Sequence, residues 1–360
     1  MTLLARVVSA ALEATTPAPR DAWREVAAAS DEATPYQTPE WTDTACEVSG
    51  FEDASRLYEL AGGRRLVVPL LVRRRPARAL DAAWSMPSNW GFGGIVGPGR
   101  IEPSDVAAVL PDLVGAAART IVKPGPLAAA AWAGVPARRR IPHLVHVVDL
   151  RGGFDALWSK RFSSGTRNKL RKAERVGVEV EWGCDERLVR LHGELYRRWT
   201  LGRAAERGLP PALALGLARR REPDARVATL ARRLGERCRI GVATIGGEAV
   251  ASTIVLRHGR HALYWRSASD RDRAGRAYPN YLLVARALED AAAAGVETFH
   301  MGESGGVESL MAFKEHFGAD RVHYDECRFE PWVADTLGRG GRRALAAALR
   351  AAETAARLRR

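Results

Sequence analysis

Three residues in the second half of the chain have side chains suited to proton transfer and to stabilising an oxyanion: Glu303, Lys314 and Tyr264. Glu303 follows a predicted buried strand over 296–301, where a carboxylate shielded from water can take a proton from an ammonium group. Lys314 would stabilise a tetrahedral oxyanion or orient a phosphate, and Tyr264 would donate a hydrogen bond to a leaving group. The plainer alternatives are a loop carboxylate or helix N-cap for Glu303 and core packing for the tyrosine.

A cluster of basic residues lies between 158 and 175. Hydroxyl groups within 163–166 can cap a helix, and arginines then recur at i, i+4 along one stripe while Leu170, Ala173 and Gly177 face inward. A row of guanidinium groups suits phosphates because each can donate two hydrogen bonds at once, although a solvated charged face is the common alternative. The residues predicted here to bind a phosphate-bearing ligand or an RNA backbone are Lys160, Arg161, Arg167, Arg171 and Arg175.

A second candidate anion site is the loop over 267–277, which precedes a predicted helix over 279–294. Backbone N–H groups without partners and the helix dipole favour an anion at the start of a helix. An ordinary solvent-exposed turn is the alternative. The residues predicted to bind phosphate in this loop are Arg271, Arg273, Gly275 and Arg276, and the side chains predicted to line the adjoining pocket are Trp265, Arg266 and Tyr281.

The elements that must position these residues follow an α/β order. Segments 55–72 and 239–256 each have the pattern of a β-hairpin with a Gly-Gly turn, at Gly62-Gly63 and at Gly246-Gly247. The same spacing of similar elements in both halves is consistent with a duplicated unit, although such hairpins are common in α/β proteins. A strand over 144–150 follows a Pro- and Gly-containing stretch, which predicts a domain boundary near residue 150.

Composition limits the class of protein. The chain has 360 residues, which is long enough for two domains, and its 46% hydrophobic share with 10 Trp is that of a globular protein. No apolar run is long enough to span a bilayer, the first residues lack the pattern of a signal peptide, and the four scattered cysteines form no disulfide or zinc motif. We therefore expect a cytoplasmic protein, and its net charge of +13 favours an anionic partner.

Two other constellations are rejected on spacing. Ser304 and His316 suggest a hydrolase triad, but residues 302–306 lack the Gly-x-Ser-x-Gly pattern of a nucleophile elbow. His258, His261 and Glu303 do not have the spacing of a metal site, and no metal is expected.

Taken together, three segments resemble the Fem-type and BioF2-like branch of the GNAT superfamily: residues 158–178 with Arg-x3-Arg-x-Ala, residues 279–296, and Phe313-Lys314-x2-Phe317-Gly318. The resemblance covers roughly residues 55–330. It implies that Lys314 lies at the active cleft and that Arg167 opens the basic helix of the family. The chain departs from the family pattern at Asp272, where relatives carry Gln or Arg, and at 300–305, where many relatives have Asp-Phe-Gly-Gly.

The resemblance also implies the fold and the activity. We expect an α/β protein of two tandem GNAT-like halves, each a mixed twisted sheet flanked by helices: a degenerate half over 1–150, an acyl-transfer half over 151–332, and a basic C-terminal helix over 333–360. The implied enzyme is an acyltransferase that forms an amide bond on a small-molecule or peptide-like amine, without a bound cofactor. Its donor is an aminoacyl-tRNA or, as the alternative, an acyl-CoA. Contact of the C-terminal helix with a membrane surface is the least favoured expectation.

Overall fold

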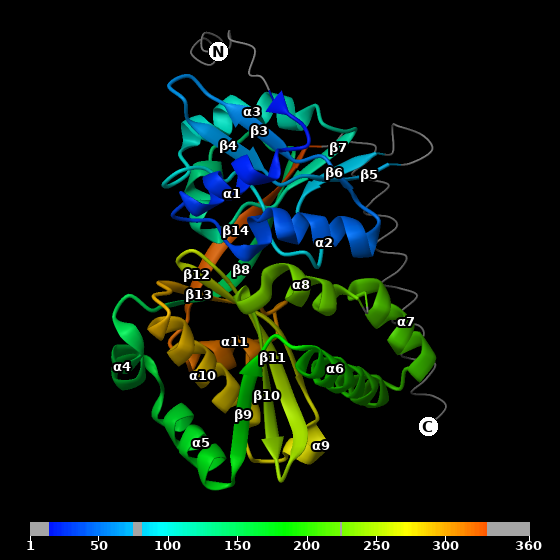
Figure 1. The fold of residues 1–360 in the computed structure, drawn as a ribbon, viewed down its shortest axis with the longest axis vertical. Coiled ribbons are helices and arrows are strands. Elements are labelled where there is room, and N and C mark those ends of the chain that lie inside the picture. Colours follow the sequence, from blue (N-terminus) through cyan, green and yellow to red (C-terminus); the bar gives the residue numbers. More distant parts are fainter. Residues whose placement is uncertain (1–13, 75–80, 224, 330–360) are drawn as a thin grey trace. The chain divides into compact units, whose positions relative to one another are not determined.

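The computed structural model describes residues 14–74, 81–223 and 225–329, which form two compact α/β units (Figure 1). Among the described residues, the first unit contains those up to Pro142 together with 324–329, and the second contains His143–His323. The boundary between the two units therefore lies inside a strand, between Pro142 and His143, and not near residue 150 as the sequence predicted. The C-terminal helix expected over 333–360 lies outside the described residues.

The first unit contains two small sheets. Its larger sheet has the strand order β2-β5-β6-β7-β14, and its smaller sheet has the order β1-β3-β4. All pairs are antiparallel except β6 and β7, which are parallel and joined through helix α3. The bounds are β1 Ala14–Thr15, α1 Arg20–Ala28, α2 Pro39–Ser49, β2 Glu52–Asp53, β3 Arg56–Glu59, β4 Arg65–Val68, β5 Leu71–Arg73, β6 Ala82–Ser85, α3 Pro103–Val114, β7 Arg119–Val122 and β14 Asp320–Phe329.

The second unit has one sheet with the order β8-β13-β12-β11-β10-β9. Here too a single pair is parallel, β12 with β13, and helix α10 joins the two strands. The bounds are β8 Arg139–Asp149, α4 Gly153–Ala156, a π-helical turn η4 Leu157–Arg161, α5 Ser164–Arg175, β9 Val178–Gly183, α6 Glu186–Arg207, α7 Pro211–Arg221, α8 Arg226–Leu234, β10 Cys238–Ile245, β11 Glu248–His258, β12 His261–Ser269, α9 Arg271–Ala274, α10 Pro279–Ala293, β13 Thr298–Glu303 and α11 Glu308–Glu315.

Local sequence signals explain the main elements of the second unit. The β10–β11 hairpin forms as predicted, because Gly246 and Gly247 both adopt the positive φ values that its tight turn requires. In α5, Ser163 Oγ accepts a hydrogen bond from the backbone N–H of Thr166 and caps the helix. Leu170 is buried, as expected from the helical spacing, whereas Gly177 is exposed and lies beyond the end of the helix.

Two predicted boundaries are wrong. The strand expected to end the hairpin over 55–72 is interrupted at Pro69, which has no N–H to donate to a neighbouring strand. β4 therefore ends at Val68 in the smaller sheet, and β5 begins at Leu71 in the larger one. The loop expected over 267–277 is shorter than predicted, because β12 continues to Ser269 and the next residues form the one-turn helix α9.

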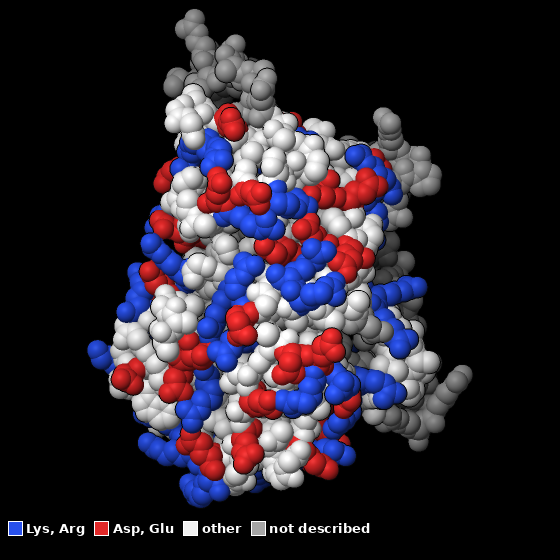
Figure 2. Space-filling view, viewed as in Figure 1, with Lys and Arg blue, Asp and Glu red and all other residues white. Residues whose placement is uncertain are grey.

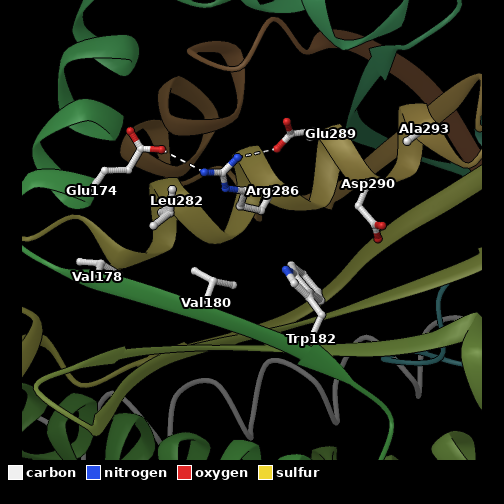
Figure 3. Close-up of a pocket in the computed structure, with 9 residues that line it drawn as sticks. All are labelled: Glu174, Val178, Val180, Trp182, Leu282, Arg286, Glu289, Asp290 and Ala293. Carbon is white, nitrogen blue, oxygen red and sulfur yellow. Dashed lines mark hydrogen bonds and ion pairs between the residues drawn. The ribbon is translucent and has the colours of Figure 1, made fainter.

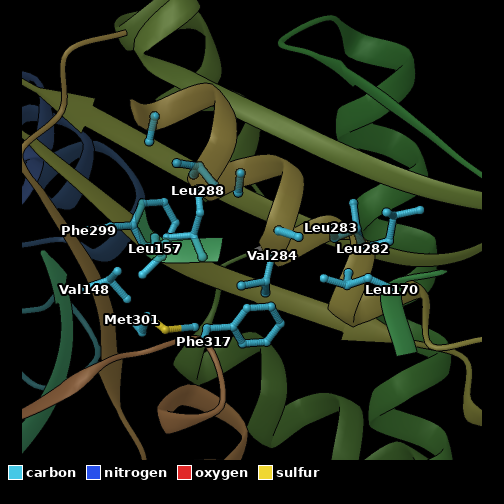
Figure 4. Packing of buried hydrophobic residues seen from close by; sticks show 14 of the residues in the cluster. Val148, Leu157, Leu170, Leu282, Leu283, Val284, Leu288, Phe299, Met301 and Phe317 are labelled. Atoms are coloured by element: carbon cyan, nitrogen blue, oxygen red, sulfur yellow. The ribbon is translucent and has the colours of Figure 1, made fainter. Parts of the chain in front are cut away.

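The core of the second unit lies between its sheet and helices α5 and α10 (Figure 4). Leu170 of α5 and Leu288 of α10 pack with Phe299 and Met301 of β13, and all four side chains are at most 2% exposed. Helix α6 covers the opposite face of the sheet, where His192 Nδ1 lies 2.9 Å from Ser252 Oγ of β11 (Figure 1). The sheet therefore separates α10 and α5 from α6.

Candidate functional site

The parallel strands β12 and β13 stop pairing before either strand ends. Their register runs from His261 opposite Thr298 to Leu263 opposite His300. Beyond that point β12 stays paired with β11, with a bulge at Trp265, and β13 stays paired with β8 as far as Glu303. Because parallel strands end at the same edge of a sheet, the first turn of α10, the end of β13 and helix α11 gather at this edge.

Glu303 lies at this edge and pairs with a histidine from the next strand. His143 Nδ1 lies 3.1 Å from Glu303 Oε1, and the two side chains are 20% and 37% exposed. Both groups therefore reach solvent while holding each other in place. A carboxylate that orients an imidazole can support proton transfer, so the pair has the chemistry expected of a general base.

Lys314 of α11 contacts the backbone at the end of β13. Its Nζ donates to the carbonyl oxygens of Gly302, at 2.7 Å, and Glu303, at 2.9 Å, and the residue is only 2% exposed. Burial lowers the pKa of Lys314 to about 8, although the nearby Glu303 carboxylate acts in the opposite direction. In this structure Lys314 fixes the backbone that carries Glu303, and its predicted role toward a substrate stays a prediction.

A second histidine of β8, His146, contacts helix α11. His146 is fully buried, and its Nε2 lies 3.4 Å from Glu315 Oε1 of α11. Burial lowers the pKa of His146. The sequence analysis did not single out His143 or His146. The available signal was two histidines within residues 141–148, a stretch of β8 that is otherwise apolar.

The predicted pocket residues of β12 divide between different environments. Tyr264 packs against the core beside α10, and burial raises the pKa of its hydroxyl. The Trp265 ring lies between two guanidinium groups, with Arg226 at 5.0 Å and Arg266 at 5.5 Å from its centroid. Arg266 also pairs with Glu222. Trp265 and Arg266 thus belong to a polar network, whereas Tyr264 belongs to the core.

The start of α10 carries a cluster of lysine and tyrosine side chains. Lys169 of α5 donates from Nζ to the hydroxyl of Tyr281 at 2.8 Å and lies 4.4 Å from the centroid of that ring. Lys172 lies 5.4 Å from the Tyr278 ring. Tyr281 also packs edge-on against Phe313 of α11 at 5.0 Å, so this cluster adjoins the helix that carries Lys314. Two ammonium groups beside a helix N-terminus favour a bound anion.

Four of the predicted phosphate-binding arginines are held by groups of the protein. Arg167 donates to the carbonyl of Phe162 at 2.6 Å, and Arg161 donates to the carboxylate of Asp320 at 2.6 Å. In the segment before α10, Arg271 pairs with Glu206 at 3.1 Å and Arg273 with Glu248 at 2.9 Å. The carboxylates partly neutralise Arg161, Arg271 and Arg273, whereas Arg167 is held by a backbone carbonyl.

The remaining predicted residues lie at the surface. Lys160, Arg171 and Arg175 are exposed along η4 and α5, and Arg276 is exposed before α10. Gly275 has φ of +49° and ends α9, so its conformation favours glycine at this turn. Lys169 and Lys172, which the sequence analysis did not select, contact Tyr281 and Tyr278 at the start of α10.

The basic charge is interspersed with acidic charge on the face that Figure 2 displays. Arginines of α9 and η4 are likewise paired with carboxylates. A net charge of +13 therefore does not translate into one continuous basic surface there. The lysine and tyrosine cluster at the start of α10 therefore indicates an anion-binding site more specifically than the net charge does.

A groove of 490 Å³ lies between β9 and α10 (Figure 3). Its apolar wall is formed by Val180 and Trp182 of β9. Arg286 of α10 lines the groove and pairs with Glu174 of α5 at 3.0 Å and with Glu289 of α10 at 2.7 Å. The groove has three acidic lining residues, Glu174, Glu289 and Asp290, and one basic residue, Arg286, so it lacks the positive charge expected of a phosphate site.

Comparison with known proteins identifies the class. Residues 160–315 match the family model described as an acetyltransferase (GNAT) domain. No curated protein matches the chain. This match supports an acyltransferase, and it contains the parallel pair, α10 and all of α11 described above.

The solved structures extend the likeness of fold over both units. The crystal structure of FemX superposes with a TM-score of 0.62 at 11% identity, over 87% of this chain and 96% of FemX. A conserved protein of unknown function from Bacteroides thetaiotaomicron gives 0.55 at 14% identity, over 88% and 99% of the two chains. The C-terminal domain of a putative lysylphosphatidylglycerol synthetase from Agrobacterium fabrum gives 0.50 at 14%, over 82% and 93%. The chain therefore shares the fold of these structures, which confirms the predicted α/β fold class.

No helix within the described ranges 14–74, 81–223 and 225–329 is long and apolar enough to cross a membrane. Within the same ranges no group of three or more histidine, cysteine or acidic side chains is arranged to hold a metal ion.

Proposed function

We propose that the protein transfers an aminoacyl group from an aminoacyl-tRNA to a primary amine and forms an amide bond. The observation that carries the proposal is the cluster of Lys169, Lys172, Tyr278 and Tyr281 at the start of α10. Lysines interleaved with aromatic rings suit the end of a single-stranded nucleic acid, because the ammonium groups bind phosphates and the rings stack with bases. Aminoacyl-tRNA is made in the cytoplasm, which is where we place the protein.

Exposed arginines of α5 extend this cluster away from the start of α10. Arg171 and Arg175 are exposed and lie on the same helix as Lys169 and Lys172. A tRNA has phosphates along its backbone beyond the aminoacylated end, whereas an acyl-CoA has none beyond its nucleotide. An extended row of cations along α5 therefore favours the RNA donor.

The reaction requires a neutral amine and a stabilised oxyanion. The amine nitrogen attacks the carbonyl carbon of the aminoacyl ester, the new C–N bond forms, and the C–O bond to the terminal ribose breaks. One proton of the attacking ammonium group passes to the Glu303–His143 pair, and the proton lost from the amide nitrogen goes to the departing ribose oxygen. Lys314 holds the main chain at Gly302 and Glu303, which keeps the base in position.

An acyl-CoA donor is the second candidate, and one feature favours it. The segment Gly275-Arg276-Ala277 precedes the N-terminus of α10, where backbone N–H groups and the helix dipole favour a diphosphate. In that reaction the bond that breaks is C–S, and the proton goes to the thiolate of coenzyme A.

Thermal unfolding with each donor distinguishes the two candidates, because a ligand that binds only the folded state raises the midpoint. The proposal predicts that deacylated tRNA and aminoacyl-tRNA raise the midpoint in a salt-dependent manner, while coenzyme A and acetyl-CoA leave it unchanged. Stabilisation by coenzyme A without any effect of tRNA would replace the proposal with the acyl-CoA alternative. A tRNA-stabilised protein that transfers no acyl group to any amine in a panel of amino acids and diamines would contradict both.

A further inference from the structure

Helices α6 and α7 and the segment that leads into α8 enclose a cavity of 400 Å³ on the face of the sheet opposite α10. Val189, Leu215 and Val227 give it an apolar lining, and Arg266 reaches it from β12. Ligand cavities that hold small molecules begin at about 300 Å³. The cavity is therefore large enough for a compound of the size of an amino acid.

The wall of this cavity contains a buried carboxylate with one oxygen unpaired. Glu222 is 8% exposed, and its Oε2 accepts hydrogen bonds from Arg226, at 3.2 Å, and from Arg266. Its Oε1 is buried and has no hydrogen-bond partner within the described part of the chain. A buried anionic oxygen without a donor costs free energy, and a ligand ammonium group would supply the missing donor.

The mouth of the cavity carries charge of the opposite sign. Arg190, Arg197 and Arg219 line it and are exposed, whereas Glu194 is the exposed acidic residue among its lining side chains. Exposed guanidinium groups suit a carboxylate or phosphate, which they can bind with two hydrogen bonds. The cavity thus has, on one of its lining residues, a buried acceptor oxygen without a partner, and it has an excess of cations at its mouth.

The cavity also adjoins the place where the parallel strands separate. Arg266 follows the bulge at Trp265, and the β12–β13 register has ended at Leu263. The start of α10 lies on the other face of the sheet. A donor bound at α10 and an amine bound in the cavity would therefore approach the separated strands from opposite faces.

We propose that this cavity binds the acyl acceptor and that the acceptor is a primary amine with an anionic group at its other end. Glu222 recognises the ammonium form of the amine, and the arginines at the mouth bind the anionic group. The inference rests on the proposed acyl transfer. It adds the chemical class of the acceptor and the residues that select it.

Binding is tested by calorimetry with three probes of equal chain length: 5-aminopentanoate, pentylamine and pentanoate. We expect saturable binding of 5-aminopentanoate and affinities about tenfold or more weaker for the other two, because each lacks one charged contact. Glu222→Gln should weaken 5-aminopentanoate about tenfold and leave pentanoate unchanged. Arg197→Gln should weaken 5-aminopentanoate but not pentylamine, while Arg220→Gln, an exposed α7 residue outside the cavity, should change neither.

A pair of glycines on α6 provides a test that does not touch the charged network. Gly193 lines the cavity and Gly202 does not, and a Cβ added at either meets no atom within 4 Å. Gly193→Phe should fill the cavity and reduce 5-aminopentanoate binding at least about tenfold, whereas Gly202→Phe should keep it within about twofold. Equal binding of the three probes, or full binding by folded Gly193→Phe, would overturn the inference.

A transfer assay separates this inference from the proposed function. Acyl transfer to amines that is unaffected by Gly193→Phe would refute the acceptor cavity and leave the proposed activity standing. Selective binding of 5-aminopentanoate to a protein that binds neither tRNA nor coenzyme A would support the cavity and refute the proposed activity.

Discussion

His143 and Glu303, which are far apart in the sequence, meet through the pairing of β8 with β13, with 3.1 Å between Nδ1 and Oε1. If this pair takes the proton of the attacking amine, Glu303→Gln and His143→Asn should each lower kcat/KM by about 10² to 10⁴. Steady-state transfer kinetics measure the effect. Glu308→Gln, an exposed residue of α11, is the matched control and should keep wild-type kinetics. Unchanged kinetics in both folded variants would remove the pair from the mechanism.

The lysines at the start of α10 should determine donor affinity. Replacing Lys169 and Lys172 by Gln should weaken tRNA binding and reduce the slope of log affinity against log salt by about 2, since each lost phosphate contact contributes about 1. A double variant of Arg207 and Arg220, exposed residues at other sites, removes the same two charges and should keep the wild-type slope. Identical slopes in the two double variants would show that only net charge matters.

Arg167 should contribute to stability more than to donor binding. Its guanidinium donates to the carbonyls of Trp158 and Phe162, so Arg167→Ala should lower the free energy of unfolding by about 1 to 3 kcal/mol. Arg171→Ala and Arg175→Ala should change it by less than about 0.5 kcal/mol, because both side chains are exposed. Urea denaturation measures the difference. A loss of tRNA affinity without a loss of stability in Arg167→Ala would reverse this assignment.

Lys314 should make stability depend on pH. Its pKa is about 8 in the folded protein and 10.5 as the reference value, so the unfolded chain holds this proton more tightly. Between pH 8 and 10.5 the unfolded state binds more protons at this site, and the free energy of unfolding should rise with pH. Lys314→Met removes this contribution. The free energy of unfolding of the wild type minus that of the variant should therefore rise with pH across that range. Urea titrations that give the same difference in free energy of unfolding at every pH would contradict this role of Lys314.

The sequence predicted elements whose signals are local. Helix α10 begins at Pro279 as expected, because proline is favoured in the first turn, and α5 begins at its serine cap. Which basic residues of α5 face α10 was harder to predict. Spacing of i, i+4 selects arginines, but packing of the helix through Leu170 and Ala173 decides which basic residues reach α10, and those are Lys169 and Lys172.

Contacts that depend on sheet register had no local signal. The pairing of His143 with Glu303 requires the antiparallel match of β8 with β13. The unpaired oxygen of Glu222 depends on how Arg266 at a β-bulge meets the end of α7. Such relationships follow from tertiary packing and cannot be read from the spacing of residues in one segment.

The central claim is tested most directly by following radiolabelled amino acid from a mixture of aminoacyl-tRNAs into amide product, with 5-aminopentanoate and a panel of amino acids as acceptors. We expect an alkali-stable amide product whose formation requires the acylated tRNA, is lost in Glu303→Gln and does not occur when acetyl-CoA is the donor. Transfer from acetyl-CoA with none from aminoacyl-tRNA would contradict it.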